Sequence, residues 1–376
     1  MNQESQERFT ATYQICASSL KDAQQYARDT ALEQTVECPY ELIADTPIEH
    51  TAAGCVEKVS SAGSGFYRAV ISYEARAAGS ELTELLNMLF GNTSLKPGFR
   101  LESFRLDSPL YSLYKGPRFG IQGIRKLTEV PSGPILMSAI KPLGRTPSEL
   151  AHMVYELALG GCPLIKDDHS LYSQSYAPFK ERVARCAEAV QEANHKTGGH
   201  SLYIANCSAD GTQFMERCFQ AKELGASGIM AAPALTGFGA VRELSARDDF
   251  GLPVFIHPCF SGGMVLSSHS GIAPGCYYGQ ISRLSGADAV IFTSYGGRFS
   301  FSSDTCRDIA QKSREPMGPM APIFPIPSGG MHWELFHDLK KLYGPDTIFL
   351  VGGALQTEGP DLTENTRFFI NHLNRD

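Results

Sequence analysis

Gly160-Gly161-Cys162-Pro163-Leu164-Ile165-Lys166-Asp167-Asp168-His169 reads as a short, buried strand that ends in a lysine, two aspartates and a histidine. Because side chains alternate along an extended segment, only some of these four can share one face. A lysine beside two aspartates can be an ordinary salt bridge, but a buried lysine can also be modified or used as a base. Carboxylate and imidazole groups are in addition metal ligands. The segment therefore predicts either a structural ion pair or a reactive site at the end of a strand.

Apolar runs of strand length recur along the chain from residue 135 onward, and amphipathic stretches such as Pro147–Leu159 separate them. The eight runs cover 135–140, 163–165, 202–205, 228–232, 253–256, 289–292, 323–327 and 348–351. They are nearly all apolar, as expected of parallel strands buried on both faces. Eight β-α units over about 240 residues predict a (β/α)8 TIM barrel. A doubly wound open sheet is the competing fold, but it needs fewer units and a glycine fingerprint after its first strand.

The residues before this pattern predict a separate, smaller α+β unit. In order they give a strand, a helix, two strands, a helix and a strand: 9–15, 20–37, 49–58, 66–73, 80–89 and 99–106. Ser80 is the expected N-cap of the second helix. The order β-α-β-β-α-β is that of a ferredoxin-like sandwich. We therefore expect two domains, residues 1–127 and 128–376.

The composition argues against several classes of protein. Of the 376 residues, 43% are hydrophobic and 19% are charged, which is ordinary globular material. The formal net charge of −7 argues against a nucleic-acid or anionic-membrane partner. No apolar run approaches the roughly 20 residues of a membrane helix, and the polar start at residues 1–5 lacks a signal-peptide core. The ten cysteines form no CxxC pair, so we expect free thiols and a cytoplasmic location.

Reactive or glycine residues follow seven of the eight predicted strands, where a TIM barrel collects its chemistry. These ends carry Lys141, Lys166 to His169, Asn206, His257, Thr293, Ser328-Gly329-Gly330 and Gly352-Gly353. Lys141 can act there as an acid or base, although a solvated loop lysine has the same sequence signature. His257 can transfer a proton or be a hydrogen-bonded core histidine. The two glycine pairs follow strands seven and eight, and jointly they favour a backbone cradle for a phosphate.

These motifs together resemble the large subunit of ribulose-bisphosphate carboxylase/oxygenase (RuBisCO), and in particular the RuBisCO-like (form IV) proteins. The resemblance is carried by Ala139-Ile140-Lys141-Pro142, Gly160 to His169, Ser173-Gln174, Ile256-His257, Pro327-Ser328-Gly329-Gly330-Met331-His332 and Val351-Gly352-Gly353. It covers nearly the whole chain. It implies the same fold, an N-terminal ferredoxin-like α+β domain followed by a TIM barrel.

The resemblance also implies a set of site residues. Lys166, Asp168 and His169 match the metal-ligand positions, which implies Mg²⁺ and a carbamylated Lys166. Lys141, Lys166 and His257 match catalytic positions. The matching phosphate and substrate positions are Ser328, Gly329, Gly330, Gly352, Gly353 and Arg298. Glu33 and Asn92 match residues that reach a neighbouring subunit's site, which implies a homodimer with sites at the subunit interface.

The chain departs from the family pattern at several of these positions. His169 stands where the family has a glutamate ligand, and a neutral imidazole is a poorer ligand for Mg²⁺ than a carboxylate. Leu143 follows the proline of a lysine-proline-lysine motif, so the second lysine is missing. Pro258 replaces an arginine that grips one phosphate, the strand-six histidine is absent from Val290-Ile291-Phe292-Thr293, and the mobile-loop lysine matches Arg298 at best. The missing parts are those that carboxylation needs.

The sequence therefore predicts a RuBisCO-like enzyme that enolises a small phosphorylated keto-sugar or keto-acid, of enolase or isomerase type, and not a CO₂-fixing carboxylase. One alternative is a decarboxylase or C–C hydrolase of a keto sugar acid phosphate. A second is a non-catalytic regulatory or binding relic of RuBisCO, which His169 and Pro258 favour. The methylthio-diketo enolases share the His257-Pro258 pattern but tend to carry a lysine at the position of Asn92.

Overall fold

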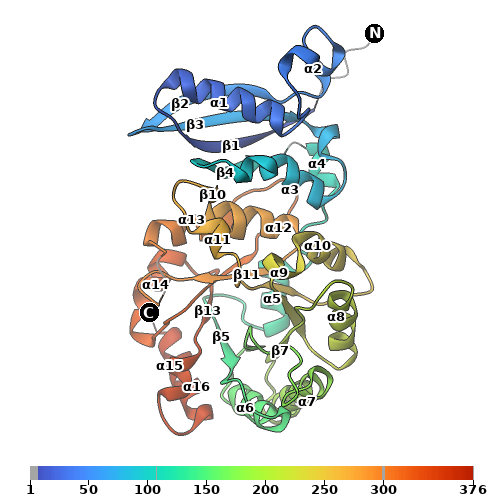
Figure 1. The fold of residues 1–376 in the computed structure, drawn as a ribbon. Coiled ribbons are helices and arrows are strands. Elements are labelled where there is room, and N and C mark those ends of the chain that lie inside the picture. Colours follow the sequence, from blue (N-terminus) through green and yellow to red (C-terminus); the bar gives the residue numbers. More distant parts are fainter. Residues whose placement is uncertain (1–6, 107, 299–300, 376) are drawn as a thin grey trace.

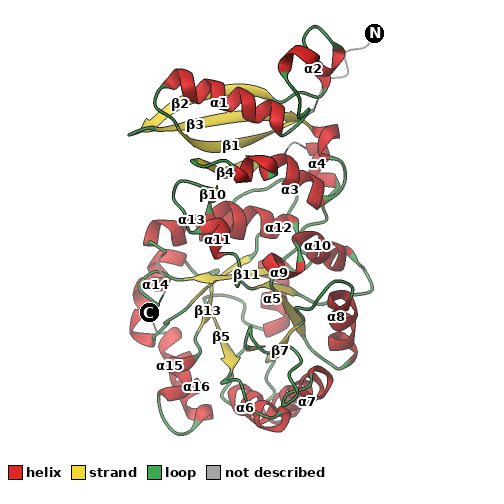
Figure 2. Ribbon diagram, viewed as in Figure 1, coloured by secondary structure: helices red, strands yellow, loops and turns green. Residues whose placement is uncertain are grey.

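The computed structural model describes residues 7–106, 108–298 and 301–375, and it shows two units built on separate sheets (Figure 1). An antiparallel sheet with its helices forms the N-terminal unit, and a parallel, barrel-shaped sheet ringed by helices forms the rest (Figure 2). The predicted fold, a ferredoxin-like unit followed by a TIM barrel, is confirmed. The polar start at residues 1–5 lies outside the described residues. No helix in the described part of the chain is long and apolar enough to span a bilayer.

The N-terminal sheet has the predicted strand order. β1 (Arg8–Cys16) pairs antiparallel with β3 (Phe66–Glu74) and with β4 (Phe99–Arg105), and β2 (Cys55–Gly63) pairs with the far side of β3. Every second residue of β1 is buried, because one face of the strand lies on the core. Helix α1 (Leu20–Glu33) contacts strands β1, β2 and β3 of this sheet.

Two local predictions for this unit were wrong. The run over 49–58 was expected to be extended throughout, but it begins in the short helix α2 (Pro47–Thr51), and β2 starts only after it. Pro47 suits the first turn of a helix, since its missing N–H has no intrahelical partner there. Ser80 does not cap α3 (Leu82–Phe90), because the N-cap is Glu81 and its side chain makes no capping bond.

The barrel contains all eight predicted strands in parallel register. Their bounds are β5 Ile135–Ile140, β6 Leu164–Asp167, β7 Leu202–Asn206, β8 Gly228–Ala231, β9 Val254–Ile256, β11 Ala289–Thr293, β12 Phe324–Ser328 and β13 Ile348–Leu350. β12 lies against β13, which closes the sheet. The longer surrounding helices are α6 Pro147–Leu159, α7 Phe179–Thr197, α8 Gln213–Glu223, α10 Phe238–Ala246, α13 Ser303–Arg314, α14 Phe336–Tyr343 and α16 Leu362–Leu373. A π-helical segment, Gly275–Ile281, continues into α12 (Ser282–Leu284) between β9 and β11.

Alternate strand residues fill the barrel interior as one apolar cluster, which includes Leu164 of β6. Because the strand alternates, Lys166 lies on that inner side and Asp167 faces the helices. Helix α5 (Gly120–Thr128) adds Ile121 and Ile124 to the same cluster. Since α5 packs with the barrel, we propose that the domain boundary lies at or before this helix rather than at 127/128.

A two-strand pairing joins the units. The short strand β10 (Gly271–Ile272), which follows β9, pairs parallel with β4 and extends the N-terminal sheet. Just before it, the Ser268 carbonyl accepts a hydrogen bond from the Gln14 side chain at 2.8 Å, and the His269 ring stacks on Phe66 with centroids 5.0 Å apart. The loop after β9 is therefore fixed at its far end by the N-terminal unit.

Candidate active site

A cavity of about 1010 Å³ lies at the carboxyl ends of the barrel strands. It brings together most of the predicted site residues from separate strands. These are Lys141, Lys166, Asp168, His169, His257, Arg298, Ser328, Gly329, Gly330, Gly352 and Gly353. Glu33 and Asn92 do not line it. Residues as far apart in sequence as Lys141 and Gly353 therefore share one mouth, as expected of a TIM barrel.

Lys166 reaches the cavity from the inner side of β6 and is almost fully buried, with 2% of its surface exposed. Its Nζ donates to the Asp167 carbonyl at 2.7 Å. Burial lowers the pKa of Lys166 to about 8, although the charges of Asp168 and Asp167 oppose the shift. A lysine with this pKa has an appreciable neutral fraction near physiological pH, so it can act as a base.

Asp167 is a structural residue. Its fully buried carboxylate forms an ion pair with Arg182 at 3.2 Å. It also accepts hydrogen bonds from the Tyr203 hydroxyl at 2.7 Å and from the Asn206 main-chain N–H at 2.9 Å. The ordinary salt-bridge interpretation of the lysine-aspartate segment thus holds for this aspartate, with an arginine from α7 as the partner. Asn206 is structural too, since its side chain donates to the carbonyls of the loop after β6.

Asp168 and His169 form a pair at the rim of the cavity. The His169 Nδ1 lies 3.1 Å from the Asp168 Oδ1, and the Ser170 main-chain N–H donates to the same oxygen at 3.0 Å. Burial alone would raise the pKa of Asp168, but the bond to His169 and the charge on Lys166 outweigh it and hold that pKa well below its usual range. Asp168 is therefore a carboxylate at any physiological pH.

His257 lies at the end of β9 and stacks on His169, with ring centroids 4.5 Å apart and planes 3° from parallel. Burial lowers the pKa of His257 well below its usual value, and the charges of Lys166 and His169 add to this effect. The Cys259 main-chain N–H donates to its Nδ1 at 3.1 Å. The neutral imidazole therefore carries its proton on Nε2, where it can donate to a substrate oxygen.

Lys141 follows β5 and lies across the first glycine of the last pair. A Cβ placed on Gly352 would lie 2.8 Å from the Lys141 Nζ, whereas a Cβ on Gly353 would meet nothing within 4 Å. Gly352 thus makes room for the lysine. This close approach gives Gly352 a function besides the phosphate contact that the sequence predicts.

The glycines after β12 have the backbone conformation of a turn. Gly329 and Gly330 have φ angles of +88° and +98°, which favour glycine, and the Arg298 main-chain N–H donates to the Gly329 carbonyl at 3.2 Å. The Ser328 hydroxyl donates to the Phe292 carbonyl at 2.9 Å, so its hydrogen is already used. Main-chain N–H groups are therefore the hydrogen-bond donors that this segment can offer to a phosphate.

Several cavity residues were missed by the sequence analysis. The Tyr278 hydroxyl lies 2.7 Å from the Ser261 Oγ, and burial raises the pKa of Tyr278 to about 12. Apolar side chains form one wall: Val265, Leu266, Phe301 and Met331. Met331 is part of a motif that the sequence singled out. Val265 ends the short helix α11 (Gly262–Val265), and Leu266 and Phe301 lie outside helices and strands, so no periodic pattern places any of the three at the cavity.

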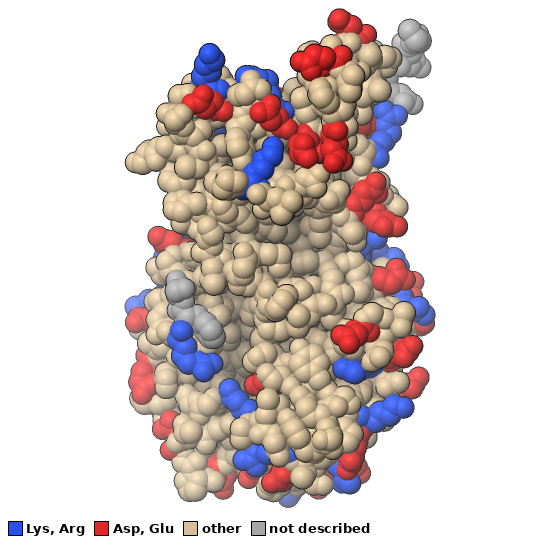
Figure 3. Space-filling view, in the orientation of Figure 1, with Lys and Arg blue, Asp and Glu red and all other residues tan. Residues whose placement is uncertain are grey.

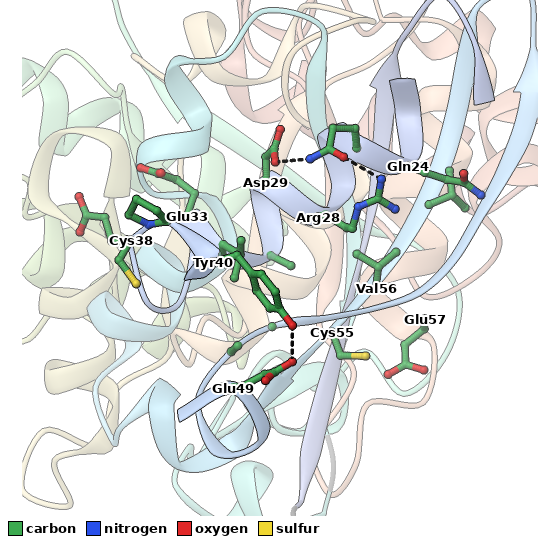
Figure 4. A pocket seen from close by; sticks show the side chains of 18 of the residues that line it. Gln24, Arg28, Asp29, Glu33, Cys38, Tyr40, Glu49, Cys55, Val56 and Glu57 are labelled. Atoms are coloured by element: carbon green, nitrogen blue, oxygen red, sulfur yellow. Dashed lines mark hydrogen bonds between the residues drawn. The ribbon is translucent and has the colours of Figure 1, made fainter. Parts of the chain in front are cut away.

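Glu33 and Asn92 meet each other on the N-terminal unit. The Asn92 side chain donates to the Glu33 carboxylate at 3.1 Å and to the Glu37 carboxylate at 3.0 Å. Glu33 lines a separate hollow of about 1380 Å³ beside α1 and β2 (Figure 4). The polar groups of that hollow pair with one another, as the Tyr40 hydroxyl does with Glu49 at 2.6 Å. It holds no converging set of reactive groups comparable to the barrel mouth.

The residues at the implied metal position do not fit the family's Mg²⁺ site. Mg²⁺ prefers oxygen ligands in octahedral geometry, and one of the two family carboxylates is the imidazole of His169 here. That imidazole is paired with Asp168, the remaining carboxylate. In the described residues, no three His, Cys, Asp or Glu side chains are grouped as a metal site. We therefore assign no step of the reaction to a metal.

The mouth of this (β/α)8 barrel thus brings together two lysines, two stacked imidazoles and glycine amides, a set of groups that can move protons and contact an anion. The sequence model of the ribulose bisphosphate carboxylase large chain, catalytic domain, matches residues 120–358. The chain belongs to this family, and its relatives are RuBisCO-like proteins.

Relatives extend along the whole chain. The 5-methylthioribulose-1-phosphate isomerase of Rhodospirillum rubrum is 35% identical over 365 residues, which are 97% of this chain and 96% of the relative. The 2,3-diketo-5-methylthiopentyl-1-phosphate enolase of Geobacillus thermodenitrificans is 34% identical over 289 residues, 76% of this chain and 69% of the relative. The crystal structure of a Rubisco-like protein from Rhodopseudomonas palustris has a TM-score of 0.88 at 35% identity, covering 99% of this chain and 100% of the other.

Proposed function

We propose that this protein enolises a small, singly phosphorylated keto-sugar, as an isomerase or enolase and not as a carboxylase. The observation that carries the proposal is the meeting of Lys141, Lys166 and His257 in one cavity with the glycines after β12 and β13. The names of the relatives, an isomerase and an enolase of phosphorylated methylthio compounds, support the same reaction type.

The chemistry follows from the residues. A base removes a proton from the carbon next to the substrate carbonyl, and the carbonyl oxygen takes up the negative charge. We assign the proton transfer to Lys141 or Lys166, since both line the cavity. The Nε2–H of His257 donates to the developing oxyanion, where a fixed donor in a buried site is most effective. Return of the proton to the former carbonyl carbon, with transfer of the neighbouring hydroxyl proton to the oxyanion, forms the new carbonyl and completes an isomerisation.

Two features favour a substrate with one phosphate and one apolar end. The main-chain N–H groups near Gly329 and Gly353 provide one anion cradle, and Pro258 stands where the resemblance places the arginine of a second phosphate grip. The wall of Val265, Leu266 and Met331 offers apolar contact to the rest of the substrate. A methylthio group, as in the compounds named for the relatives, has this character.

The test is proton exchange in D₂O. The purified protein is incubated with 5-methylthioribulose 1-phosphate and with 2,3-diketo-5-methylthiopentyl 1-phosphate, and ¹H NMR follows loss of the signal next to the carbonyl. Exchange followed by a new ketose would identify an isomerase, and exchange followed by an enol would identify an enolase. Release of CO₂ or of a short acid from a keto sugar acid phosphate would favour the cleavage alternative instead. No exchange with any ketone would contradict the proposal and favour the non-catalytic alternative.

We further propose a homodimer in which Glu33 and Asn92 complete the partner's site. Both lie outside the cavity of their own chain, and they are already held together by a hydrogen bond. In Figure 3, charges of both signs surround a broad area without Lys, Arg, Asp or Glu near the junction of the two units. Depletion of charge is typical of the centre of a protein interface.

A further inference from the structure

We propose that this site works without Mg²⁺ and that Lys166 stays an amine, because a cluster of Asp168, His169 and His257 occupies the place of the family's metal ligands. The reaction assigned to this site rests on the proposed function. The claim that Mg²⁺ does not bind concerns only the side chains of this chain and is tested without any substrate.

Both ring nitrogens of His169 have polar partners in this arrangement. Its Nδ1 lies 3.1 Å from the Asp168 Oδ1, and its Nε2 lies 3.2 Å from the Ser170 Oγ. The flat stacking on His257 at 4.5 Å holds the ring in this orientation. A metal could bind the Nε2 of His169 only by displacing the Ser170 hydroxyl, and the Nδ1 only by displacing Asp168.

Asp168 is engaged as well. Its Oδ1 already accepts from the Ser170 main-chain N–H and faces the His169 ring. A carboxylate that keeps these partners offers at most one oxygen to a cation. Mg²⁺ demands near-octahedral coordination by oxygen ligands, so one carboxylate oxygen beside an imidazole is a weak site for it.

Lys141 is near enough to offset one negative charge, but a carbamate on Lys166 would put two anions side by side. The lysine is 2% exposed, and its Nζ donates to the Asp167 carbonyl at 2.7 Å. Carbamylation would replace this buried cation by an anion next to the Asp168 carboxylate, and like charges in a buried site disfavour each other. With no metal to neutralise both groups, the amine is the more stable form.

The same residues can then replace the metal's contribution. When the base breaks the C–H bond, its electron pair forms the C=C bond and the carbonyl π pair moves to oxygen. The Lys166 ammonium and the His257 Nε2–H are hydrogen-bond donors that line the cavity and can hold this oxyanion. Lys141 takes the carbon-bound proton and returns it to the former carbonyl carbon, while the proton of the neighbouring hydroxyl passes to the oxyanion and a new carbonyl forms, so no external acceptor is required.

The experiment compares Mg²⁺ binding by the full chain and by His169→Glu, measured by isothermal titration calorimetry with bicarbonate present. We expect no saturable binding by the wild type and at least about a 10-fold gain in Mg²⁺ affinity in the variant, because a second carboxylate is restored. His195→Glu is the matched control, since this exposed histidine lies on α7 and adds the same charge away from the site. Labelling with ¹³C-bicarbonate should give no carbamate signal in the wild-type NMR spectrum.

Saturable Mg²⁺ binding by the wild type that disappears in Lys166→Met would overturn the proposal, as would a carbamate signal lost in that variant. If His169→Glu folds but binds Mg²⁺ no more tightly than the His195→Glu control, His169 is not what prevents Mg²⁺ binding, and the proposal fails. If His169→Glu does not fold, the wild-type titration and the carbamate spectrum still decide. Proton exchange of the substrate that persists in the presence of a chelator supports metal-free catalysis. If the wild type shows neither proton exchange nor Mg²⁺ binding, the enolase assignment is refuted, whereas the claim that Mg²⁺ does not bind still stands.

Discussion

At the scale of single residues, the burial of Lys166 is the feature with the largest chemical effect. A charged ammonium loses hydration in the barrel interior, and Asp168 and Asp167 compensate only in part, so the pKa falls to about 8. Removing the amine should therefore remove the reaction rather than the fold.

We expect Lys166→Met to lower proton exchange by about 10²- to 10⁴-fold, the usual range for a lost acid-base group. The midpoint of urea unfolding should not fall, because a Met of similar volume does not carry the cost of a buried charge. Lys180→Met, at an exposed position, is the control and should leave exchange unchanged. Exchange at the wild-type rate in Lys166→Met would remove this lysine from the mechanism.

Gly352 and Gly353 offer a matched pair of substitutions. A Cβ on Gly352 would lie 2.8 Å from the Lys141 Nζ, so Gly352→Ala displaces that flexible lysine rather than the backbone. We expect exchange to drop by roughly 10- to 100-fold, as for a catalytic group that moves by about 1 Å. Gly353→Ala, whose Cβ meets nothing within 4 Å, should keep Lys141 in place. Equal rates in the two variants would argue against a role for Lys141.

At the scale of elements, strand periodicity separates the two aspartates. β6 ends at Asp167, which points outward to the arginine of α7, and Asp168 follows at the cavity. A second element contact closes the opposite end of the barrel. The buried Asp288 carboxylate accepts from the main-chain N–H groups of Phe119 and Gly120 before and within α5, at 2.6 and 2.8 Å, and from that of Val254 in β9 at 2.9 Å.

Asp288 should produce a measurable pH dependence of stability. Burial raises its pKa from 3.8 to about 6, although its three main-chain hydrogen bonds oppose the shift. The folded state therefore binds more protons between these values, so the contribution is fully present below pH 3.8 and is lost as pH rises through about 6. The free energy of unfolding of the wild type minus that of Asp288→Asn should fall by roughly 2 to 3 kcal/mol from about pH 4 to about pH 7. A difference independent of pH would show that this carboxyl is not shifted.

At the scale of the whole molecule, the N-terminal unit extends its sheet with β10 of the barrel and carries Glu33 and Asn92 away from their own cavity. In the proposed twofold dimer these residues complete the partner's mouth, and each subunit makes the same contact with the other.

Mixed dimers test this arrangement. Lys166→Met and Glu33→Gln should each lower exchange strongly when assayed alone. After unfolding and refolding as an equal mixture, half of the dimers are hybrids with one intact site, so about a quarter of the wild-type activity should return. Light scattering gives the oligomeric state. A monomer, or no recovery from a mixture that forms hybrids, would remove Glu33 from the site.

The strands and their order along the chain could be predicted from the amino-acid sequence alone. The eight apolar runs and the β-α-β-β-α-β order of the N-terminal unit were readable because burial on one or both faces leaves a periodicity in the chain. Lys141, Lys166 and His257 were predictable for a related reason, since each follows or ends a barrel strand and the fold brings such positions together. Helix boundaries such as Ser80 were less predictable, because several residues nearby can end or begin the helix equally well.

The contacts of each polar residue, by contrast, depend on the tertiary fold. Lys166, Asp167, Asp168 and His169 are adjacent in sequence, yet Asp167 is paired with Arg182 from α7 and His169 is stacked on His257 from β9. The cavity is also lined by Val265, Leu266 and Phe301, which lie in a short helix or in loops with no periodic pattern of their own. Hydrogen bonds and stacking depend on which side chains meet across the barrel, and those meetings join residues far apart in the chain, so no local sequence signal could have given them.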